Sequence, residues 1–308
     1  MSDENPFGVN QTKRLTVQTA EDLLYRQFNC LDHGFVRLID YMGGDDAVVQ
    51  SARVSYGKGT KKFSEDKGLV RYLMRHRHTT PFEMVELKFH AKMPIFVARQ
   101  WIRHRTANVN EYSARYSVMD NEFYIPKESD LAVQSSSNRQ GRGKTVPPSE
   151  AEKVIQLLKE DGARAYEHYT HLLNEDSEKS GEPKDKDRSM LARELARMGL
   201  SLNFYTQWYW KIDFHNLCHF LGLRLDSHAQ YEIRVYAEEM AKIARAVAPN
   251  SYEAFEDYHL NSISLSGPEV ECMKEILKGK STEEVAESIN NKREREEFLA
   301  KFAKIKNT

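Results

Sequence analysis

The sequence predicts an α+β fold in which several long helices pack with a small antiparallel or mixed sheet. The first observation is the order of the elements, because a few strand patterns come early in the chain and helical patterns dominate the rest. The second is the alternation of apolar and polar residues over residues 85–93, which is typical of a strand with one packed face. The third is the lack of a glycine-rich turn between strand and helix, which excludes a dinucleotide-binding fingerprint and a P-loop.

The early elements are strands and short helices. Pro94 is expected to begin a helix directly after the strand at 85–93, because proline favours the first helical position. Apolar residues then recur at helical spacing as far as Arg103. The remaining early predictions are a strand at residues 35–42, a turn at 43–46, a short helix at 47–49 capped by Asp46, and a helix at 67–75.

The later elements are mostly helical. Residues 128–148 have almost no apolar content at their centre, and we expect a mobile loop inserted in the domain. The predicted helices are residues 149–173, a helical region at 189–210 with aromatic residues at its end, 214–223, and 227–247, with a charged linker at 177–187. Two short amphipathic helices are expected beyond residue 268, the second opened by a capping box at Ser281 and Glu284.

Charge and composition exclude several classes of protein. The chain has 308 residues, with 45 Lys and Arg against 46 Asp and Glu, and 40% of its residues are hydrophobic. This composition allows a core, and the balanced charge argues against a general nucleic-acid coat, so we expect no nucleic-acid partner. No stretch approaches the ~18 apolar residues that a membrane span needs, and the polar N-terminus lacks a secretory signal. We therefore expect no membrane association.

The cysteines argue against disulfides and zinc. Cys30, Cys218 and Cys272 are odd in number, far apart, and form no CxxC pair. This usage fits the reducing cytoplasm and excludes a disulfide scaffold or a zinc ribbon. Cys218 lies inside an apolar run and is expected to be a core residue and not a nucleophile.

The densest group of polar residues is Arg103-His104-Arg105 and the segment behind it. Three cationic side chains at a helix C-terminus could simply complement the helix dipole. That explanation leaves out the following segment, where Asn108, Glu111 and Ser113 supply directed hydrogen bonds and little packing. Such a segment beside a rigid helix is where binding sites tend to lie, and the arginines suit a phosphate or carboxylate.

Several histidines could carry chemistry. His78 follows a basic run and could be a solvated turn residue, or a neutral imidazole that relays a proton. His215 and His219 are four residues apart on one helix, which resembles a zinc-protease helix, but Asn216 stands where the general-base glutamate would be. We reject that assignment and expect no metal site, while a purely structural role for both histidines stays open. Arg224 lies between two helices, where a chain reversal could direct it into a cleft.

The chain resembles the flavin-dependent thymidylate synthases. Arg103-His104-Arg105, seven residues and then Ser113 match the RHR-x7-S signature of that family. The resemblance extends over residues 31–250 and excludes the N-terminal arm, the insertion and the tail. The further matching segments are Gly34-Phe35-Val36, Ser51 to Ser55, His78-x-Thr80-Pro81-Phe82-Glu83, Phe96 to Trp101, Glu122 to Pro126, Asn203-x-Tyr205-Thr206 and Leu223-Arg224-x-Asp226-Ser227-His228-Ala229-Gln230.

The resemblance implies an enzyme that methylates dUMP to dTMP. It implies the fold of that family, FAD as cofactor, methylenetetrahydrofolate and NADPH as co-substrates, and a homotetramer that shares its active sites between subunits. It divides the chain into a polar arm (1–30), a catalytic domain (31–250) with a loop inserted at 128–148, and a helical extension (251–308). The implied FAD-binding residues are Thr80, Arg103, His104, Arg105, Asn108, Glu111, Asp213, His215 and His219, with His78 beside them.

The implied nucleotide-binding residues overlap with this set. They are Gln100, Arg103, Glu111, Tyr112, Ser113, Ala114, Arg115, Arg197 and Arg224. Of these, Arg224 is the expected catalytic residue, because a guanidinium at the pyrimidine edge would stabilise negative charge that develops on the ring. His78 is expected to relay a proton, and Ser113 to bind near the uracil and not to act as a nucleophile. The flavin and the folate supply the redox and one-carbon chemistry, so the family needs no protein thiolate.

Two other classes of protein remain possible on the residues alone. The same arginines could serve a nucleotide- or RNA-binding module without turnover. The aromatic run from Phe204 to Trp210 could be the core or the interface of a helical scaffold. A flavin absorption band would separate the enzyme from both, and RNA binding with a steep salt dependence would favour the second class.

Overall fold

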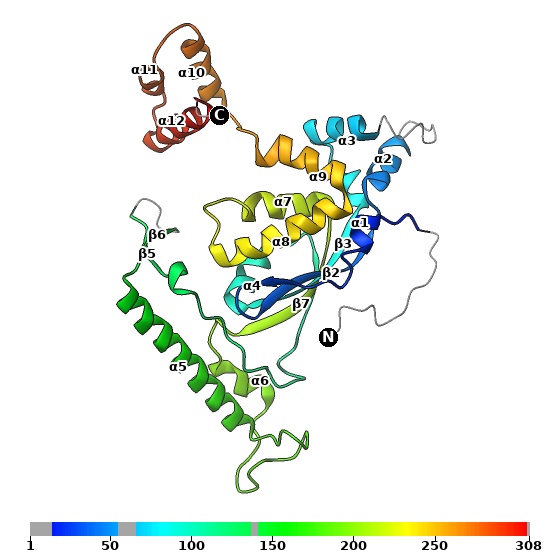
Figure 1. Cartoon of the computed structure of the whole chain (residues 1–308), viewed down its shortest axis with the longest axis vertical. Helices are drawn as coiled ribbons and strands as arrows, with labels where there is room; N and C mark the ends of the chain where they lie inside the picture. Colours follow the sequence, from blue (N-terminus) through cyan, green and yellow to red (C-terminus); the bar gives the residue numbers. More distant parts are fainter. Residues whose placement is uncertain (1–13, 55–65, 137–140, 307–308) are drawn as a thin grey trace. The chain divides into compact units, whose positions relative to one another are not determined.

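The computed structural model describes residues 14–54, 66–136 and 141–306 (Figure 1). Residues 1–13 of the predicted N-terminal arm, Ser55 of the family resemblance and residues 137–140 of the predicted loop lie outside the described residues. Contacts between residues divide the chain into two compact units, Met1–Phe255 and Glu256–Thr308.

A five-stranded antiparallel sheet forms the centre of the first unit. Its strand order is β1-β2-β3-β7-β4. The predicted strands at 35–42 and 85–93 are confirmed with shifts of one residue, and the α+β class is confirmed with them. The strands are β1 (Phe28–Cys30), β2 (Gly34–Met42), β3 (Glu86–Pro94), β4 (Asn108–Glu111) and β7 (Tyr205–Asp213).

The prediction of a helical region at 189–210 was wrong. The segment holds only a short helix α6 (Arg193–Ala196) and a 3-10 turn η4 (Arg197–Gly199) before the chain enters β7. In β7, Trp208, Trp210 and Ile212 are buried and alternate with exposed neighbours, which is the period of a strand. Aromatic side chains favour strands because they pack well on a pleated surface. β7 lies between β3 and β4, so these aromatics are core residues.

Three helices pack on the sheet and carry the site. They are α4 (Ile95–Trp101), α7 (Phe214–Arg224) and α8 (Tyr231–Val247). They confirm the predicted helices at 94–103, 214–223 and 227–247, although α8 begins four residues later than predicted. Trp101 is fully buried, and its ring centroid lies 5.2 Å from that of Phe220 and 5.3 Å from that of Trp210. This aromatic cluster fixes the end of α4 against α7 and β7.

The remaining helices of the first unit frame this layer. The predicted helix at 67–75 is confirmed as α3. The short helix predicted at 47–49 is longer than expected, because α2 runs over ten residues from Asp45. Asp46 therefore lies in the first turn of α2, and the prediction that it caps the helix was wrong. Asp45 accepts hydrogen bonds from the backbone of Asn250 (2.8 Å) and Ser251 (2.9 Å), so it caps the start of α9. The bounds are α1 (Gln18–Glu21), α2 (Asp45–Val54), α3 (Asp66–Arg75), η2 (Phe82–Met84) and α9 (Pro249–Phe255).

Within residues 128–136 and 141–148, the insertion contains regular secondary structure where a mobile loop was predicted. A turn η3 (Glu128–Asp130) leads into an antiparallel hairpin of β5 (Ala132–Gln134) and β6 (Arg142–Thr145). The predicted helix at 149–173 follows as α5 (Pro148–Leu173). Backbone pairing explains the difference, because a hairpin satisfies its peptide groups without a long apolar run.

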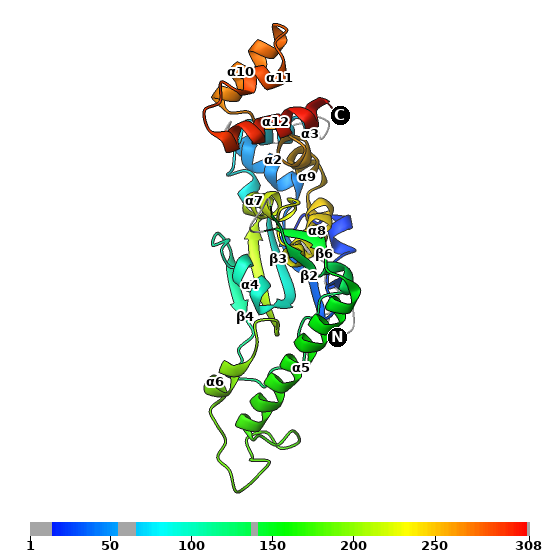
Figure 2. The same cartoon turned by 90° about the vertical axis from the view of Figure 1, so that its left-hand side faces the viewer.

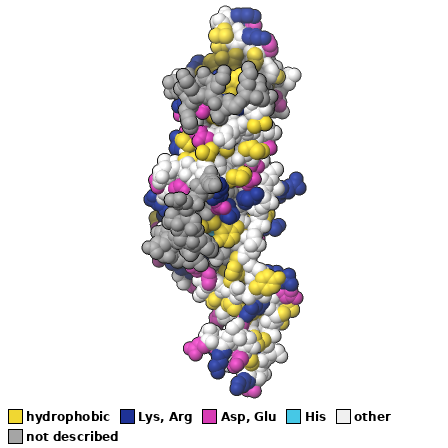
Figure 3. Space-filling model, turned by 90° about the vertical axis from the view of Figure 1, so that its right-hand side faces the viewer, with side chains coloured by type: hydrophobic (Ala, Val, Ile, Leu, Met, Phe, Trp, Pro, Cys, Tyr) yellow, Lys and Arg dark blue, Asp and Glu magenta, His cyan; other side chains and the backbone are white. Residues whose placement is uncertain are grey.

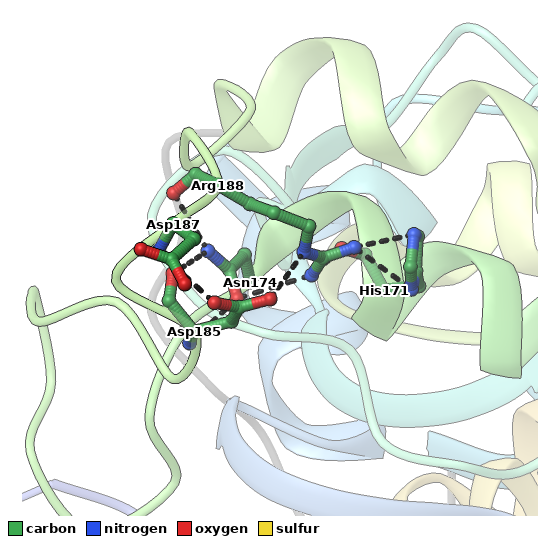
Figure 4. A network of polar contacts seen from close by, with 5 residues as sticks. All are labelled: His171, Asn174, Asp185, Asp187 and Arg188. Atoms are coloured by element: carbon green, nitrogen blue, oxygen red, sulfur yellow. Dashed lines mark hydrogen bonds and ion pairs between the residues drawn. The ribbon is translucent and has the colours of Figure 1, made fainter.

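The side chain of Asn174 joins the two ends of the predicted charged linker at 177–187 by hydrogen bonds. Asn174 ends α5 in the left-handed conformation (φ 49°), and its amide nitrogen donates to the carbonyls of Asp185 and Arg188 (2.8 and 3.0 Å). Its amide oxygen accepts from the backbone of Asp185 (3.0 Å). Figure 4 shows these contacts together with the guanidinium of Arg188, which reaches His171. These contacts hold the two ends of the linker together, so the chain comes back beside the end of α5 before it enters α6.

The second unit is a small helical bundle. It has three helices where two were predicted, α10 (Gly267–Leu277), α11 (Thr282–Ala286) and α12 (Lys292–Lys306), after a π-helix (Glu256–Leu260). Cys272, Val285 and Phe298 form its core. The complete capping box lies at Ser266 and Glu269, whereas at Ser281 the serine side chain accepts from the backbone of Glu284 (3.1 Å). No described helix in either unit is long and apolar enough to span a membrane.

Candidate functional site

The cationic turn follows α4 directly. Because buried Trp101 anchors the last turn of α4, the chain reverses at a fixed point, and the backbone nitrogen of His104 donates to the carbonyl of Trp101 (3.0 Å). Arg103 and Arg105 are exposed on either side of half-buried His104. Their guanidinium groups have no ion-pair or hydrogen-bond partner among the residues that the structure describes. The turn therefore presents two unneutralised cations, which suits an anionic ligand.

His104 is held between α7 and the turn. Nε of Arg224, at the end of α7, donates to Nε2 of His104 over 3.2 Å. The imidazole also contacts the ring of Phe220 edge to face at 4.9 Å and lies 5.9 Å from that of His219. Burial, then the charge of Arg224 and His219, lower the pKa of His104 to about 4. The imidazole is therefore neutral at pH 7, and its Nε2 accepts the hydrogen bond from Arg224.

α7 brings together four predicted residues. Asp213 caps the helix, since its side chain accepts from the backbone nitrogen of Asn216 (2.8 Å) and from the Asn216 amide (2.6 Å). Both carboxylate oxygens of Asp213 are thus engaged within the helix start. His215 is half-buried and His219 exposed along the same helix. Asp213 consequently positions α7, and its predicted contact with FAD stays a prediction.

The strand β4 joins the cationic turn to the rest of the site. It is the last strand of the sheet, and all four of its residues are exposed. Asn108 pairs with Lys211 near the start of α7, and Glu111 pairs with Trp208 further along β7. Oε1 of Glu111 accepts a hydrogen bond from the hydroxyl of Thr206 (2.8 Å). The strand thus runs from Asn108, near the start of the histidine-bearing helix α7, to Glu111, which lines a cavity.

That cavity gathers the second half of the family signature. Its volume is about 540 Å³, within the range of small-ligand pockets. Five predicted nucleotide-binding residues line it, namely Glu111, Tyr112, Ser113, Ala114 and Arg197. Arg197 has no partner for its guanidinium among the described side chains, whereas Arg115 lies outside the lining and pairs with Glu194 (3.4 Å), which does line it. Sequence reasoning missed Glu194 and Met198 in this wall.

The predicted nucleotide-binding residues form two groups within one chain. Gln100 lies on α4, Arg103 in the turn after it and Arg224 at the end of α7, and none of them lines the cavity of Ser113 and Arg197. Within a single subunit, the predicted nucleotide-binding residues therefore do not line one common cavity. β4 connects the two groups along an exposed sheet edge.

His78 and Thr80 lie in a third place, the connection between α3 and η2. Both are exposed, and the His78 ring lies 6.0 Å from that of Tyr72. Arg77 adopts the left-handed conformation (φ 58°), which turns the chain sharply before His78. η2 packs against α7, so this connection lies beside the helix that carries His215.

The donor groups fit a flat, anionic cofactor such as FAD. Arg103 and Arg105 supply unpaired cations for a diphosphate, and neutral His104 offers an aromatic face without adding charge. No three His, Cys, Asp or Glu side chains gather in metal-ligand geometry within the described ranges. All three cysteines are buried, and burial raises the pKa of the Cys218 thiol well above its usual range.

Comparisons with known proteins agree on one family. The family model described as thymidylate synthase complementing protein matches residues 37–250. A flavin-dependent thymidylate synthase of Rickettsia conorii is 55% identical over 95% of this chain and 99% of its own length. One of Rickettsia bellii is 57% identical over 88% of this chain and 92% of its own. Among solved structures, the UMP/dUMP methylase PolB of Streptomyces cacaoi with 5-bromo-UMP matches with a TM-score of 0.63 and 33% identity, covering 75% of this chain and 96% of PolB.

Proposed function

Because this chain belongs to the thymidylate synthase complementing protein family, we propose that it is a flavin-dependent thymidylate synthase that converts dUMP to dTMP. The observation that carries the proposal is the cavity of Ser113 and Arg197 at the end of β4, where the second half of the RHR-x7-S signature lines a space of nucleotide size. Bound FAD supplies hydride chemistry, with methylenetetrahydrofolate as one-carbon donor and NADPH as reductant. The chain's own residues bind and orient the cofactor and the nucleotide, and they polarise the pyrimidine ring.

The cationic turn would hold the cofactor. Arg103 and Arg105 would bind its phosphates, and neutral His104 would contribute an aromatic side chain without added charge. The further contacts are assigned to Thr80, Asn108, Glu111, His215 and His219, with Asp213 orienting the start of α7. His78, in the connection between α3 and η2, is assigned to proton relay.

The nucleotide is held between the cavity and α7. Arg197 binds its phosphate, and Ser113 with the neighbouring Tyr112 and Ala114 surrounds the sugar and ring. Arg115, which lies outside the lining and pairs with Glu194, is assigned a further contact with the nucleotide. Arg224, whose pKa burial lowers without neutralising it, stabilises negative charge on the pyrimidine. Gln100, Arg103 and Glu111 complete the contacts. A guanidinium fixed by His104 is already oriented when charge develops, so no reorganisation is needed.

Two chains contribute to each active site in this proposal, within a homotetramer. The separation of Arg224 from the cavity in one subunit supports it, and so does the exposed edge of β4. Mixing two inactive variants, Arg224→Ala and Arg197→Ala, tests it directly. Mixed oligomers contain some sites with both arginines, so activity is expected to return on mixing. Mixtures that stay as inactive as the parents contradict shared sites.

We assign residues 31–250 to the catalytic domain, 1–30 to an arm and 251–308 to a helical extension, and we propose a cytoplasmic location. Among the described side chains on the face in Figure 3, Lys and Arg are interspersed with Asp and Glu and form no continuous basic stripe for RNA. The first test is spectroscopic. The purified protein should show a flavin absorption band that shifts when dUMP is added. A colourless protein that binds RNA with a steep salt dependence contradicts the proposal.

A further inference from the structure

The inserted hairpin is joined to α8 by an ion pair between exposed Arg142 and buried Glu232. Arg142, the first residue of β6, donates from its guanidinium to Oε1 of Glu232, which is only 2% exposed. The guanidinium also donates to the carbonyl of Asp130 (3.1 Å) and lies 5.7 Å from the ring centroid of Tyr231. A buried carboxylate needs such partners, and the insertion provides the cationic one.

The carboxylate of Glu232 fixes the orientation of the side-chain amide of Gln230. The hydroxyl of Tyr124 donates to Oε1 of Glu232 (3.2 Å), and Nε2 of Gln230 donates to Oε2 (2.9 Å). A carboxylate has only acceptors, so Gln230 must direct its NH₂ group toward Glu232. The carbonyl oxygen of Gln230 then points the other way and accepts from Nε2 of Gln100.

The chain of hydrogen bonds ends at a residue of the proposed nucleotide site. With its Nε2 directed to Gln230, Gln100 keeps Oε1 without a hydrogen-bond partner among the described residues. A glutamine amide can otherwise rotate by half a turn and exchange its donor for its acceptor. The connection to Glu232 removes that freedom before any ligand binds.

We propose that Arg142, Glu232 and Gln230 are positioning residues that fix the amide of Gln100, so that Oε1 is the group offered to dUMP. The inference rests on the proposed function, which places Gln100 at the nucleotide. A fixed acceptor selects an N–H or O–H donor of the nucleotide and disfavours its phosphate, which has only acceptors at neutral pH. It gives the inserted hairpin a part in substrate binding, although the hairpin does not touch the substrate.

The experiment is a double-mutant cycle on the flavin-loaded enzyme, with the dissociation constant of dUMP measured by calorimetry. Glu232→Gln replaces a group that only accepts, so the amide of Gln230 can adopt either orientation. Gln230→Met removes the hydrogen bonds between Glu232 and Gln100 and leaves Arg142 and Glu232 paired. Each is expected to raise the dissociation constant about fivefold to tenfold, the effect of one hydrogen bond, with the flavin spectrum unchanged. In a Gln100→Met background, neither change should have a further effect. Glu238→Gln, on the exposed side of α8, is the matched control and should bind dUMP normally.

Two results would overturn the inference. One is normal dUMP affinity in Gln230→Met. The other is an equal loss of affinity with and without Gln100, which would mean that the network supports the fold and not the amide. Because Gln230→Met leaves Arg142 and Glu232 paired, it decides the matter even if Glu232→Gln fails to fold. A wild-type enzyme that binds no dUMP contradicts the proposed function as well, so the two failures are distinguishable.

Discussion

Arg224 donates a hydrogen bond from Nε to Nε2 of His104 over 3.2 Å, which joins the end of α7 to the cationic turn after α4. The two residues are 120 positions apart in the chain. A guanidinium can be satisfied by an imidazole only while the imidazole is neutral, because a protonated ring has no acceptor. Burial and the charge of Arg224 keep it neutral by lowering the pKa of His104 to about 4.

Stability should depend on pH through His104. Its pKa is lower in the folded state than the ordinary value of 6.5, so the unfolded chain binds the proton more readily. The stabilisation is complete above pH 6.5 and is lost as the pH falls toward 4, by about 2–3 kcal/mol after allowance for partial exposure. Urea unfolding of the wild type and His104→Asn at pH 7 and pH 4.5 measures this. A loss at low pH that is equal in both proteins contradicts the assignment.

Arg224→Ala should retain FAD and lose methylation. Removing a preorganised charge at the reacting ring typically lowers kcat about 100-fold to 1,000-fold. The same change removes one cause of the depressed pKa of His104, so that pKa should rise, while burial keeps it below 6.5. Turnover assays and NMR titration of the imidazole test both effects. Arg164→Ala, an exposed arginine on α5, is the control. An unimpaired rate in Arg224→Ala would remove Arg224 from the mechanism.

Cys218→Ala should remain active. The side chain is 7% exposed, inside α7, and burial raises the pKa of its thiol, so it is a poor nucleophile at neutral pH. The substitution removes one buried sulfur atom and should lower stability by about 1 kcal/mol. Steady-state rates and thermal unfolding are the measurements. Complete loss of turnover in a folded Cys218→Ala protein would indicate thiol chemistry.

Arg197→Met should weaken dUMP binding more than FAD binding. Its guanidinium is unpaired at the cavity of Ser113, and a charged hydrogen bond to a phosphate contributes about 1.5–3 kcal/mol. The dissociation constant for dUMP should therefore rise about 10-fold to 150-fold. Arg164→Met provides the comparison at an exposed ion pair. Equal affinities in the two variants would place the phosphate elsewhere.

Much of the fold could be predicted because local patterns of apolar and polar residues indicate many of its strands and helices. Residues 85–93 alternate cleanly, and α7 has an apolar face that is readable at helical spacing. β7 was missed because both faces of Tyr205–Asp213 carry aromatic residues, which hides the period of two. The hairpin at the insertion was missed because its stability depends on backbone pairing and on Arg142, neither of which has an apolar signature.

The residues of the candidate site could be predicted, but their grouping could not. The RHR-x7-S motif indicated Arg103 and Ser113 together, yet the intervening residues form β4, which sets the two halves at different places along β7. The link from Arg142 to Gln100 joins three elements that are distant in sequence, namely β6, α8 with its N-cap residue Gln230, and α4. Only a tertiary structure brings Glu232 to the same point as Arg142 and Tyr124.

The most direct test of the account is tritium release from dUMP labelled at C5. The purified chain is incubated with FAD, methylenetetrahydrofolate and NADPH, and released tritium is measured beside dTMP formation. The account predicts release that requires all components, persists in Cys218→Ala and falls at least about 100-fold in Arg224→Ala. Release that needs no flavin, or a folded flavin-bound protein that forms no dTMP, would contradict it.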